Sequence, residues 1–279
     1  MNRTRKTVAD IRGQKGVRQM TMVYVRELDE ARACTEAGID VLSIEQPFWT
    51  PAMREAAGDC FVQVGLQYGR LATTDDYLRA AHDAILLGGD CCYCAASTEV
   101  VARLSAEGVP IVGHVGLIPS RRTWTGGFRA VGRTLETALL VMDQIRALEG
   151  AGAFAAEIEV VPAAITGEIA KRTSLVLFSM GAGTGGDAQY LFAEDILGYT
   201  PGHRPRHAKV YRDFAAEYER LQRERVAAFG EFRADVESAA YPEPHHLVDV
   251  DLDVVTAFVA ALDDEFHDTP NDAHPEEHR

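Results

Sequence analysis

Two residues of this chain carry side chains suited to proton transfer and stand at the ends of apolar runs. His114 lies in the segment GHVGLIP at 113–119, and Glu159 lies in IEVVP at 158–162. A histidine and a carboxylate are common proton-transfer groups in enzymes. In an α/β barrel the residues that end the strands lie at the catalytic face. We therefore predict that His114 and Glu159 are catalytic.

Each of these residues also has a structural interpretation without catalysis. His114 could be a core histidine with both ring nitrogens satisfied. Glu159 could form an ion pair with an arginine such as Arg129 or Arg133. Each alternative alone is about as plausible as catalysis, but two such residues at strand ends together favour function.

Short apolar runs alternate with helical segments along most of the chain. The runs are continuously apolar, as expected for parallel strands that are covered on both faces. The helical segments at 27–37, 75–87, 97–107 and 134–151 are followed or closed by glycines that suit helix C-termini, namely Gly38, Gly88, Gly108 and Gly152. The predicted strands are 20–25, 40–44, 61–66, 90–95, 110–115, 155–161, 175–180 and, more weakly, 189–192. This alternation predicts an α/β fold, a (β/α)₈ TIM barrel.

A glycine-rich segment follows the seventh predicted strand. It reads GAGTGG at 181–186 and lacks the lysine of a phosphate-binding P-loop, so nucleotide binding is not favoured. We expect a tight loop there, with backbone N–H groups facing a ligand.

The C-terminal part of the chain predicts a helical extension of the barrel. A long helical stretch covers 203–240, and a short helix at 251–262 carries an apolar stripe. We expect that stripe to pack on the barrel or on a neighbouring subunit. The prediction is one domain over 1–262, followed by a disordered acidic tail at 263–279.

Composition excludes several classes of function. The formal net charge of -14 disfavours binding to nucleic acid and to anionic membranes. No apolar run has the length of a membrane span, and the basic segment 1–19 has no apolar region after it, so we expect no signal peptide. The five cysteines do not resemble a disulfide framework. A cytoplasmic protein that acts on a small molecule is the simplest interpretation.

Cys91, Cys92 and Cys94 could suggest a soft metal site. Strand alternation would send Cys91 and Tyr93 to one face and the other two cysteines to the opposite face. We therefore expect buried small hydrophobic side chains rather than a metal centre.

Several motifs resemble the ketopantoate hydroxymethyltransferase (3-methyl-2-oxobutanoate hydroxymethyltransferase) family over roughly residues 7 to 247. They are GHVGLIP at 113–119, GGFR at 126–129 with GRT at 132–134, AGAF at 151–154 leading into EVVP at 159–162, GAG at 181–183, and DILGYTPG at 195–202. The resemblance implies a barrel of the phosphoenolpyruvate mutase and isocitrate lyase type. It also implies a homo-oligomer, since family members form decamers. His114 matches a substrate-contacting histidine and Glu159 the general base that removes the C3 proton of a 2-oxo acid.

The resemblance also implies a Mg²⁺ ion, which binds the 2-oxo acid, and methylenetetrahydrofolate, which donates the one-carbon unit. The family's metal-site positions, two aspartates and a glutamate, correspond here to Gln46, Val64 and Ala95, and its lysine corresponds to Tyr93. A shift of one residue would place Glu45 at the first position instead. Mg²⁺ needs oxygen ligands, usually with one or two carboxylates, so we predict that no metal binds at these positions.

Other residues are predicted to contact substrate in place of the metal. They are Gln46, Tyr93, Tyr68, Ser179 and Gly181. Neutral amide and phenol donors of this kind can hold a carbonyl oxygen.

Three functions remain open from the sequence. The first is an enzyme of this family with altered, metal-independent chemistry, such as C–C bond formation or cleavage of aldol type, or proton transfer next to a carbonyl. The second is a conventional 3-methyl-2-oxobutanoate hydroxymethyltransferase, with Mg²⁺ and methylenetetrahydrofolate as cofactors. The third is a non-catalytic paralogue that binds a small ligand or a partner subunit. We favour the first, for which no cofactor is expected.

Overall fold

Eight parallel strands close into a barrel in chain order, with β8 paired to β1. The structure, a computed structural model, describes residues 5–267, and the side chains of 5–263. The strands are β1 (Met20–Tyr24), β2 (Val41–Glu45), β3 (Phe61–Gly65), β4 (Cys91–Tyr93), β5 (Ile111–Gly116), β6 (Ala155–Glu159), β7 (Val176–Met180) and β8 (Ala188–Phe192). The predicted (β/α)₈ fold is confirmed, including its weakest strand.

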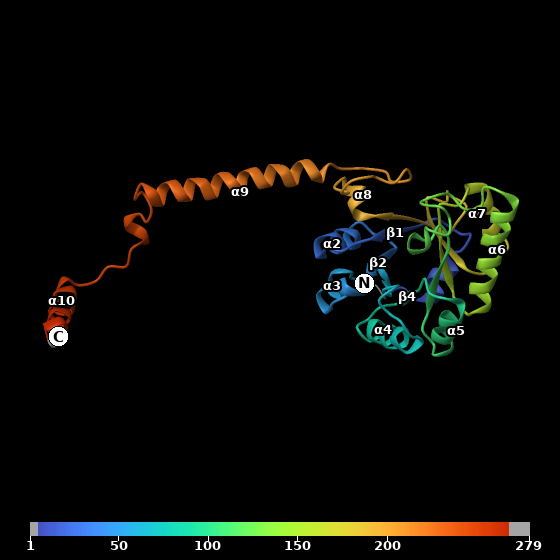
Figure 1. Cartoon of the computed structure of the whole chain (residues 1–279), viewed down its shortest axis with the longest axis horizontal. Coiled ribbons are helices and arrows are strands. Elements are labelled where there is room, and N and C mark those ends of the chain that lie inside the picture. Colours follow the sequence, from blue (N-terminus) through green and yellow to red (C-terminus); the bar gives the residue numbers. More distant parts are fainter. Residues whose placement is uncertain (1–4, 268–279) are drawn as a thin grey trace, which may run out of the picture. The chain divides into compact units, whose positions relative to one another are not determined.

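Helices surround the strands of the barrel (Figure 1). They are α1 (Val8–Gly13), α2 (Leu28–Glu36), α3 (Pro51–Ala56), α4 (Thr74–Leu86), α5 (Thr98–Ala106), α6 (Leu135–Gly150), α7 (Ala163–Ala170) and α8 (Ala193–Leu197), with 3₁₀ turns at Gln46–Phe48 and Pro119–Arg121. The sequence predicted α2, α4, α5 and α6 but not the other four. Those four have five to eight residues each, too few for a clear helical period.

The helix ends follow from local sequence. Thr73 with Asp76, and Thr134 with Thr137, form reciprocal hydrogen bonds at the starts of α4 and α6. The four glycines predicted at helix ends all have φ between +77° and +96°, which suits a residue without a side chain.

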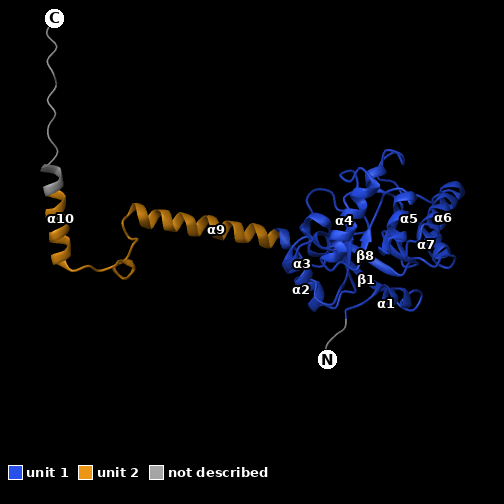
Figure 2. Ribbon diagram, turned by 90° about the horizontal axis from the view of Figure 1, so that it is seen from below, with its two compact units in different colours: residues 1–215 blue, residues 216–279 orange. Residues whose placement is uncertain are grey.

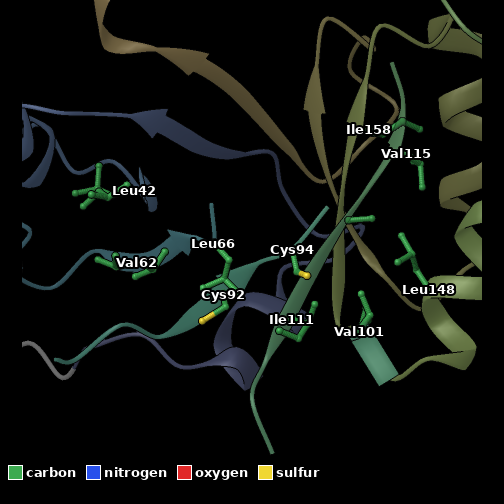
Figure 3. Close-up of a cluster of buried hydrophobic side chains, with 14 of the residues drawn as sticks. Leu42, Val62, Leu66, Cys92, Cys94, Val101, Ile111, Val115, Leu148 and Ile158 are labelled. Carbon is green, nitrogen blue, oxygen red and sulfur yellow. The ribbon is translucent and has the colours of Figure 1, made fainter. Parts of the chain in front are cut away.

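Strand alternation separates two apolar layers. Side chains such as Met22, Phe61, Cys91 and Phe178 fill the inside of the barrel. A second layer lies between the strands and the helices; Figure 3 labels part of it, including Leu42, Val62, Cys92, Ile111 and Leu148. The predicted division of the cysteines is confirmed, because Cys91 is inside while Cys92 and Cys94 face the helices. All five cysteines are free thiols.

Charged residues join the segment before β1 to the end of the barrel where the strands begin. Asp187, which precedes β8, accepts from Lys15 Nζ (3.1 Å) and from the backbone N–H groups of Gly16 and Leu177. These contacts fix the start of β1 against β7 and β8. They are distant from His114 and Glu159 along the strands and serve the closure of the barrel.

The chain divides into two compact units, residues 1–215 and 216–279 (Figure 2). The second contains nearly all of α9 (Phe214–Glu237), a 3₁₀ turn at Pro244–His246, and α10 (Leu252–His267). Val254, Val255 and Phe258 on α10 are exposed. Helix α10 extends to His267, so residues 263–267 of the predicted tail are helical, and 268–279 lie outside the described residues. That residues 1–262 form one domain stays a prediction.

Among residues 5–267, no helix is both long enough and apolar enough to cross a membrane.

Candidate active site

A cavity of about 510 Å³ opens where the barrel strands end. We call it the strand-end pocket. Its polar lining comes from β1, β2, β4, β5, β6 and β8, from Arg26 after β1, from Glu194 and Asp195 of α8, and from the connection after α8. The lining side chains include Tyr24, Ser43, Glu45, Tyr93, His114, Glu157, Glu159, Tyr190 and His207. The position at the carboxyl ends of the strands is the one that a barrel of this type uses for chemistry.

His114 on β5 is the centre of the contacts in this pocket. Its Nε2 lies 3.2 Å from Glu159 Oε2 and 2.9 Å from the carbonyl oxygen of Leu117. A carbonyl oxygen only accepts, so Nε2 carries a hydrogen and donates. Its Nδ1 lies 2.7 Å from the phenol oxygen of Tyr93. His114 therefore joins Tyr93 to Glu159 through its two nitrogens.

The electrostatic surroundings favour the charged form of His114. Burial alone lowers its pKa, but the hydrogen bond to Glu159 and the nearby charge of Glu157 outweigh burial, so the pKa of His114 is raised above its ordinary 6.5. The ring is almost fully enclosed, with 2% of its side chain exposed. The two glutamates that favour protonation of the ring, Glu157 and Glu159, both belong to β6.

A second carboxyl group lies deeper in the barrel, below Glu159. Glu157 Oε2 is 3.7 Å from His114 Nδ1, and its Oε1 accepts from Gln63 Nε2 at 2.7 Å. The same Gln63 nitrogen lies 3.1 Å from Ser43 Oγ. Burial raises the pKa of Glu157 to about 7, although His114 and Gln63 partly oppose the shift. Glu157 thus exchanges its proton near neutral pH.

Two phenols in the pocket stay protonated. Burial, together with the charge of Glu157, raises the pKa of Tyr93 and of Tyr190 well above 10. Both side chains are therefore neutral at physiological pH. A neutral phenol can donate one hydrogen bond and accept others.

The backbone around Glu159 is held in an uncommon conformation. Val160, the next residue, has φ +50°, although β-branched residues rarely adopt positive φ. Gly116, at the end of β5, has φ +84°, and a Cβ placed on it would lie 2.4 Å from the carbonyl oxygen of Glu159. Strained backbone of this kind collects at functional sites.

The structure brings some predicted residues together and leaves others apart. His114, Glu159 and Tyr93 line the strand-end pocket together. Tyr68 and Ala95 line a smaller cavity of about 270 Å³, which shares Glu45 and Tyr93 with the pocket.

The remaining predicted residues do not line the strand-end pocket. Gln46 begins the turn after β2 and is only half-buried. Gly181 lines a separate cavity, although a Cβ on it would lie 2.7 Å from His207 Nδ1. Ser179 lies on the side of β7 that faces the helices; a Cβ on Gly186 would lie 2.3 Å from its Oγ. The expectation that Ser179 faces substrate is not met, because alternate residues of a strand point to opposite sides.

Val64 is likewise outside the pocket. It belongs to the apolar layer between strands and helices, and a Cβ on Gly89 would lie 2.9 Å from Cγ2 of Val64. Its neighbour Gly65 lines the pocket instead. The residue of β3 that lines the strand-end pocket is therefore Gly65, one position beyond the residue that the sequence had matched to the metal site.

Sequence reasoning missed Glu157, Gln63, Ser43, Tyr190 and His207. One signal was available, because Glu157 precedes Glu159 by two residues on a strand and must share its face. For Glu45, which the sequence left as an alternative, the structure places the side chain at the pocket. Among the described side chains, no group of three or more His, Cys, Asp or Glu is arranged to hold a metal ion.

Comparison with known proteins gives the family. A family model described as ketopantoate hydroxymethyltransferase matches residues 49–244. The 3-methyl-2-oxobutanoate hydroxymethyltransferase of Thermus thermophilus is 32% identical over 87% of this chain and 99% of its own. That of Cenarchaeum symbiosum is 36% identical over 61% of this chain, and the match spans 60% of the relative's length.

Solved structures share the barrel at lower identity. A putative phosphonomutase from Burkholderia cenocepacia J2315 aligns with a TM-score of 0.50 and 14% identity, covering 82% of this chain and all of its own. This likeness concerns the fold alone. The matching segment and the nearly full-length Thermus relative establish that the chain belongs to the ketopantoate hydroxymethyltransferase family.

Proposed function

We propose that this chain is an enzyme that removes a proton from the carbon next to a carbonyl of a small substrate and forms or breaks a C–C bond there, without Mg²⁺. Membership in a family of hydroxymethyltransferases confirms the expected transferase-like enzyme and leaves the exact reaction open.

The observation that carries the proposal is the contact series Tyr93–His114–Glu159. The carboxylate of Glu159 is the base: it accepts the proton as the C–H bond breaks. The electron pair moves onto the carbonyl oxygen, which becomes negative. The N–H of His114 holds Oε2 of Glu159 and so keeps the carboxylate oriented during this step.

Tyr93 is the group that stabilises the negative oxygen. When His114 is an imidazolium, Nδ1 also carries a hydrogen and donates it to the phenol oxygen of Tyr93. The O–H of Tyr93 is then free to donate to the substrate oxygen. A hydrogen-bond donor positioned in this way in a largely enclosed site can stabilise an oxyanion by several kcal/mol, on the order of 3.

The donor set supports chemistry without Mg²⁺. On the strands to which the resemblance assigns a metal site, β3 presents Gly65 to the pocket, Ala95 after β4 has a methyl group, and Gln46 does not line the pocket. Glu45 is the one carboxylate that β2, β3 and β4 contribute to the pocket rim. Hard divalent cations bind oxygen ligands, so this rim fits Mg²⁺ poorly.

Hydrogen–deuterium exchange at C3 of 2-oxoisovalerate tests the proposal. We expect exchange in D₂O that EDTA leaves unchanged and that Glu159→Gln reduces by about 10²- to 10⁴-fold, the usual contribution of a positioned base. Glu168→Gln, which alters an exposed residue on α7, is the matched control. Exchange that depends on added Mg²⁺, or that survives Glu159→Gln, contradicts the proposal.

A conventional 3-methyl-2-oxobutanoate hydroxymethyltransferase is the second candidate. The presence of Glu45 at the pocket and the names of the relatives favour it. If this candidate is right, the protein forms product from 2-oxoisovalerate and methylenetetrahydrofolate, and product formation depends on Mg²⁺. A non-catalytic paralogue would bind ligand and catalyse neither reaction.

The cytoplasmic location and the homo-oligomer remain predictions.

A further inference from the structure

A second, larger cavity lies beside the strand-end pocket and is lined by cationic side chains. Its volume is about 950 Å³. Arg129 and Arg133 come from the connection between β5 and α6, and Arg206 comes from the connection after α8. His203 and His207 add two imidazoles, and Glu159 is the one carboxylate among the described residues that line it. We call this space the arginine cavity.

The arginine cavity shares part of its wall with the strand-end pocket. Both are lined by Glu159, Pro205 and His207. On another side, Arg133, Arg206 and Val160 also line the cavity that contains Gly181. A molecule in the arginine cavity can therefore reach Glu159 with one end while its other end lies among the arginines.

The arginines of this cavity are not neutralised by the side chains that the structure describes. Within residues 5–263, no carboxylate lies within ion-pair distance of Arg129, Arg133 or Arg206, whereas many other arginines of the chain have such a partner. Glu159 itself is paired with His114 rather than with Arg129 or Arg133. The chain as a whole has a formal net charge of -14, so this cluster of positive charge differs in sign from the protein around it.

The charge of the cavity comes from the arginines. Burial lowers the pKa of His207, and the charges of Glu159 and Asp195 do not reverse this. His207 is therefore mostly neutral at physiological pH, whereas guanidinium groups stay charged. Their planar forks suit the paired oxygens of a carboxylate or a phosphate. Cations gathered in a concave site also raise the local concentration of anions.

We propose that the arginine cavity binds an anionic group, a carboxylate or a phosphate, at the end of the ligand farther from the carbonyl that Glu159 acts on. Arg133 and Arg206 hold this group, with Arg129 beside them. The inference rests on the proposed function for the direction of the ligand, and it names the charge of the substrate class. Arg129, Arg133 and Arg206 are exposed to solvent, and a neutral ketone or aldehyde would leave them to water alone.

Isothermal titration at low ionic strength tests the anion site without any turnover. The probes are inorganic pyrophosphate and tricarballylate, which distinguish a phosphate from a carboxylate. We expect the wild-type chain to bind at least one of them, and Arg133→Ala/Arg206→Ala to weaken that binding by about tenfold or more, as expected for charge-assisted hydrogen bonds. Added salt should weaken it further.

Arg146→Ala is the matched control, because Arg146 is an exposed arginine on α6 that pairs with Asp143. It should bind the probe as the wild type does. Arg129→Gln provides a second, independent variant, and unchanged thermal unfolding midpoints verify that each variant folds.

The inference is overturned if neither probe binds the wild type, if the double variant binds as well as the wild type, or if Arg146→Ala weakens binding equally. The outcome separates the two proposals. Probe binding without exchange at C3 of 2-oxoisovalerate keeps the anion site and refutes the proposed reaction on this oxo acid. Exchange without probe binding supports the proposed reaction and refutes the anion site.

Discussion

The imidazole Nε2 of His114 lies 3.2 Å from the carboxylate Oε2 of Glu159, across the contact between β5 and β6. In the strand register, however, His114 pairs with Glu157, and Gly116 pairs with Glu159. The histidine therefore lies beside one glutamate in the backbone ladder and hydrogen-bonds to the next one along the strand. Both carboxyl groups act on the same ring, and single substitutions can separate their roles.

Removing the imidazole should impair the base without abolishing it. His114→Gln removes the Nε2–H that orients Glu159 and the cation that polarises Tyr93, so we expect the exchange rate to fall by about 10²-fold or more. Rate measurement from about pH 5 to 9, across the range in which histidine titrates, checks this. His82→Gln, at an exposed position on α4, is the control. Full activity in His114→Gln would remove His114 from the mechanism.

The hydroxyl hydrogen of Tyr93 should account for the contribution of this residue to catalysis. Tyr93→Phe keeps the ring and removes the donor to the substrate oxygen, so kcat should drop by about 10²- to 10³-fold. Tyr68→Phe is the comparison, because Tyr68 was also predicted to bind substrate but lies 44% exposed in the neighbouring cavity. Equal losses in both variants would contradict the special position of Tyr93.

Glu157 should make the protein less stable as pH rises. Its folded pKa is about 7 against an ordinary 4.5, so between these values the unfolded chain releases a proton that the folded chain retains. Folded stability then falls as pH rises from about 4.5 to 7, by on the order of 3 kcal/mol from this group. The raised pKa of His114 acts in the same direction, because its contribution is lost as pH rises through the folded pKa. Urea unfolding of the wild type and Glu157→Gln at several pH values measures this. If the free energy of unfolding changes with pH in the same way in both proteins, Glu157 is not the source of the pH dependence.

Gly116 should tolerate no side chain. Its φ of +84° and the 2.4 Å approach of a Cβ to the carbonyl oxygen of Glu159 mean that Gly116→Ala must shift β6. We expect a loss of about 1–3 kcal/mol in stability and a lower exchange rate, since the base is displaced. Gly150→Ala, in α6 with no atom within 4 Å of the added Cβ, should be neutral or stabilising. Similar effects at both positions would contradict the steric argument.

The thiols should be unreactive in the folded protein. Burial raises the pKa of Cys92 to about 12 and of Cys94 to about 11, and it raises that of Cys91 well above 9. Thiolate is the reactive form, so Ellman's reagent at about pH 8 should label these residues only after denaturation. Rapid labelling of Cys91 in the native protein would show that the barrel interior opens.

The sequence by itself determined the fold and predicted that His114 and Glu159 lie at the ends of two strands. Continuous apolar runs and the glycines after the helices fix eight strands in order, because parallel strands covered on both faces need apolar residues throughout. His114 and Glu159 follow from that pattern, since the ends of consecutive parallel strands meet at one face of a barrel.

Only the tertiary structure decided which side chains share that face. Gln63 and Glu157 are 94 residues apart and meet because the barrel closes. A shift of one residue reverses the face of every side chain, which is why Gly65 rather than Val64 lines the pocket and why Ser179 faces the helices. Glu159 pairs with His114 rather than with an arginine because of distances of a few ångströms. The order of residues in the sequence does not give such distances. Among the described side chains, that pairing leaves Arg129, Arg133 and Arg206 without a carboxylate partner.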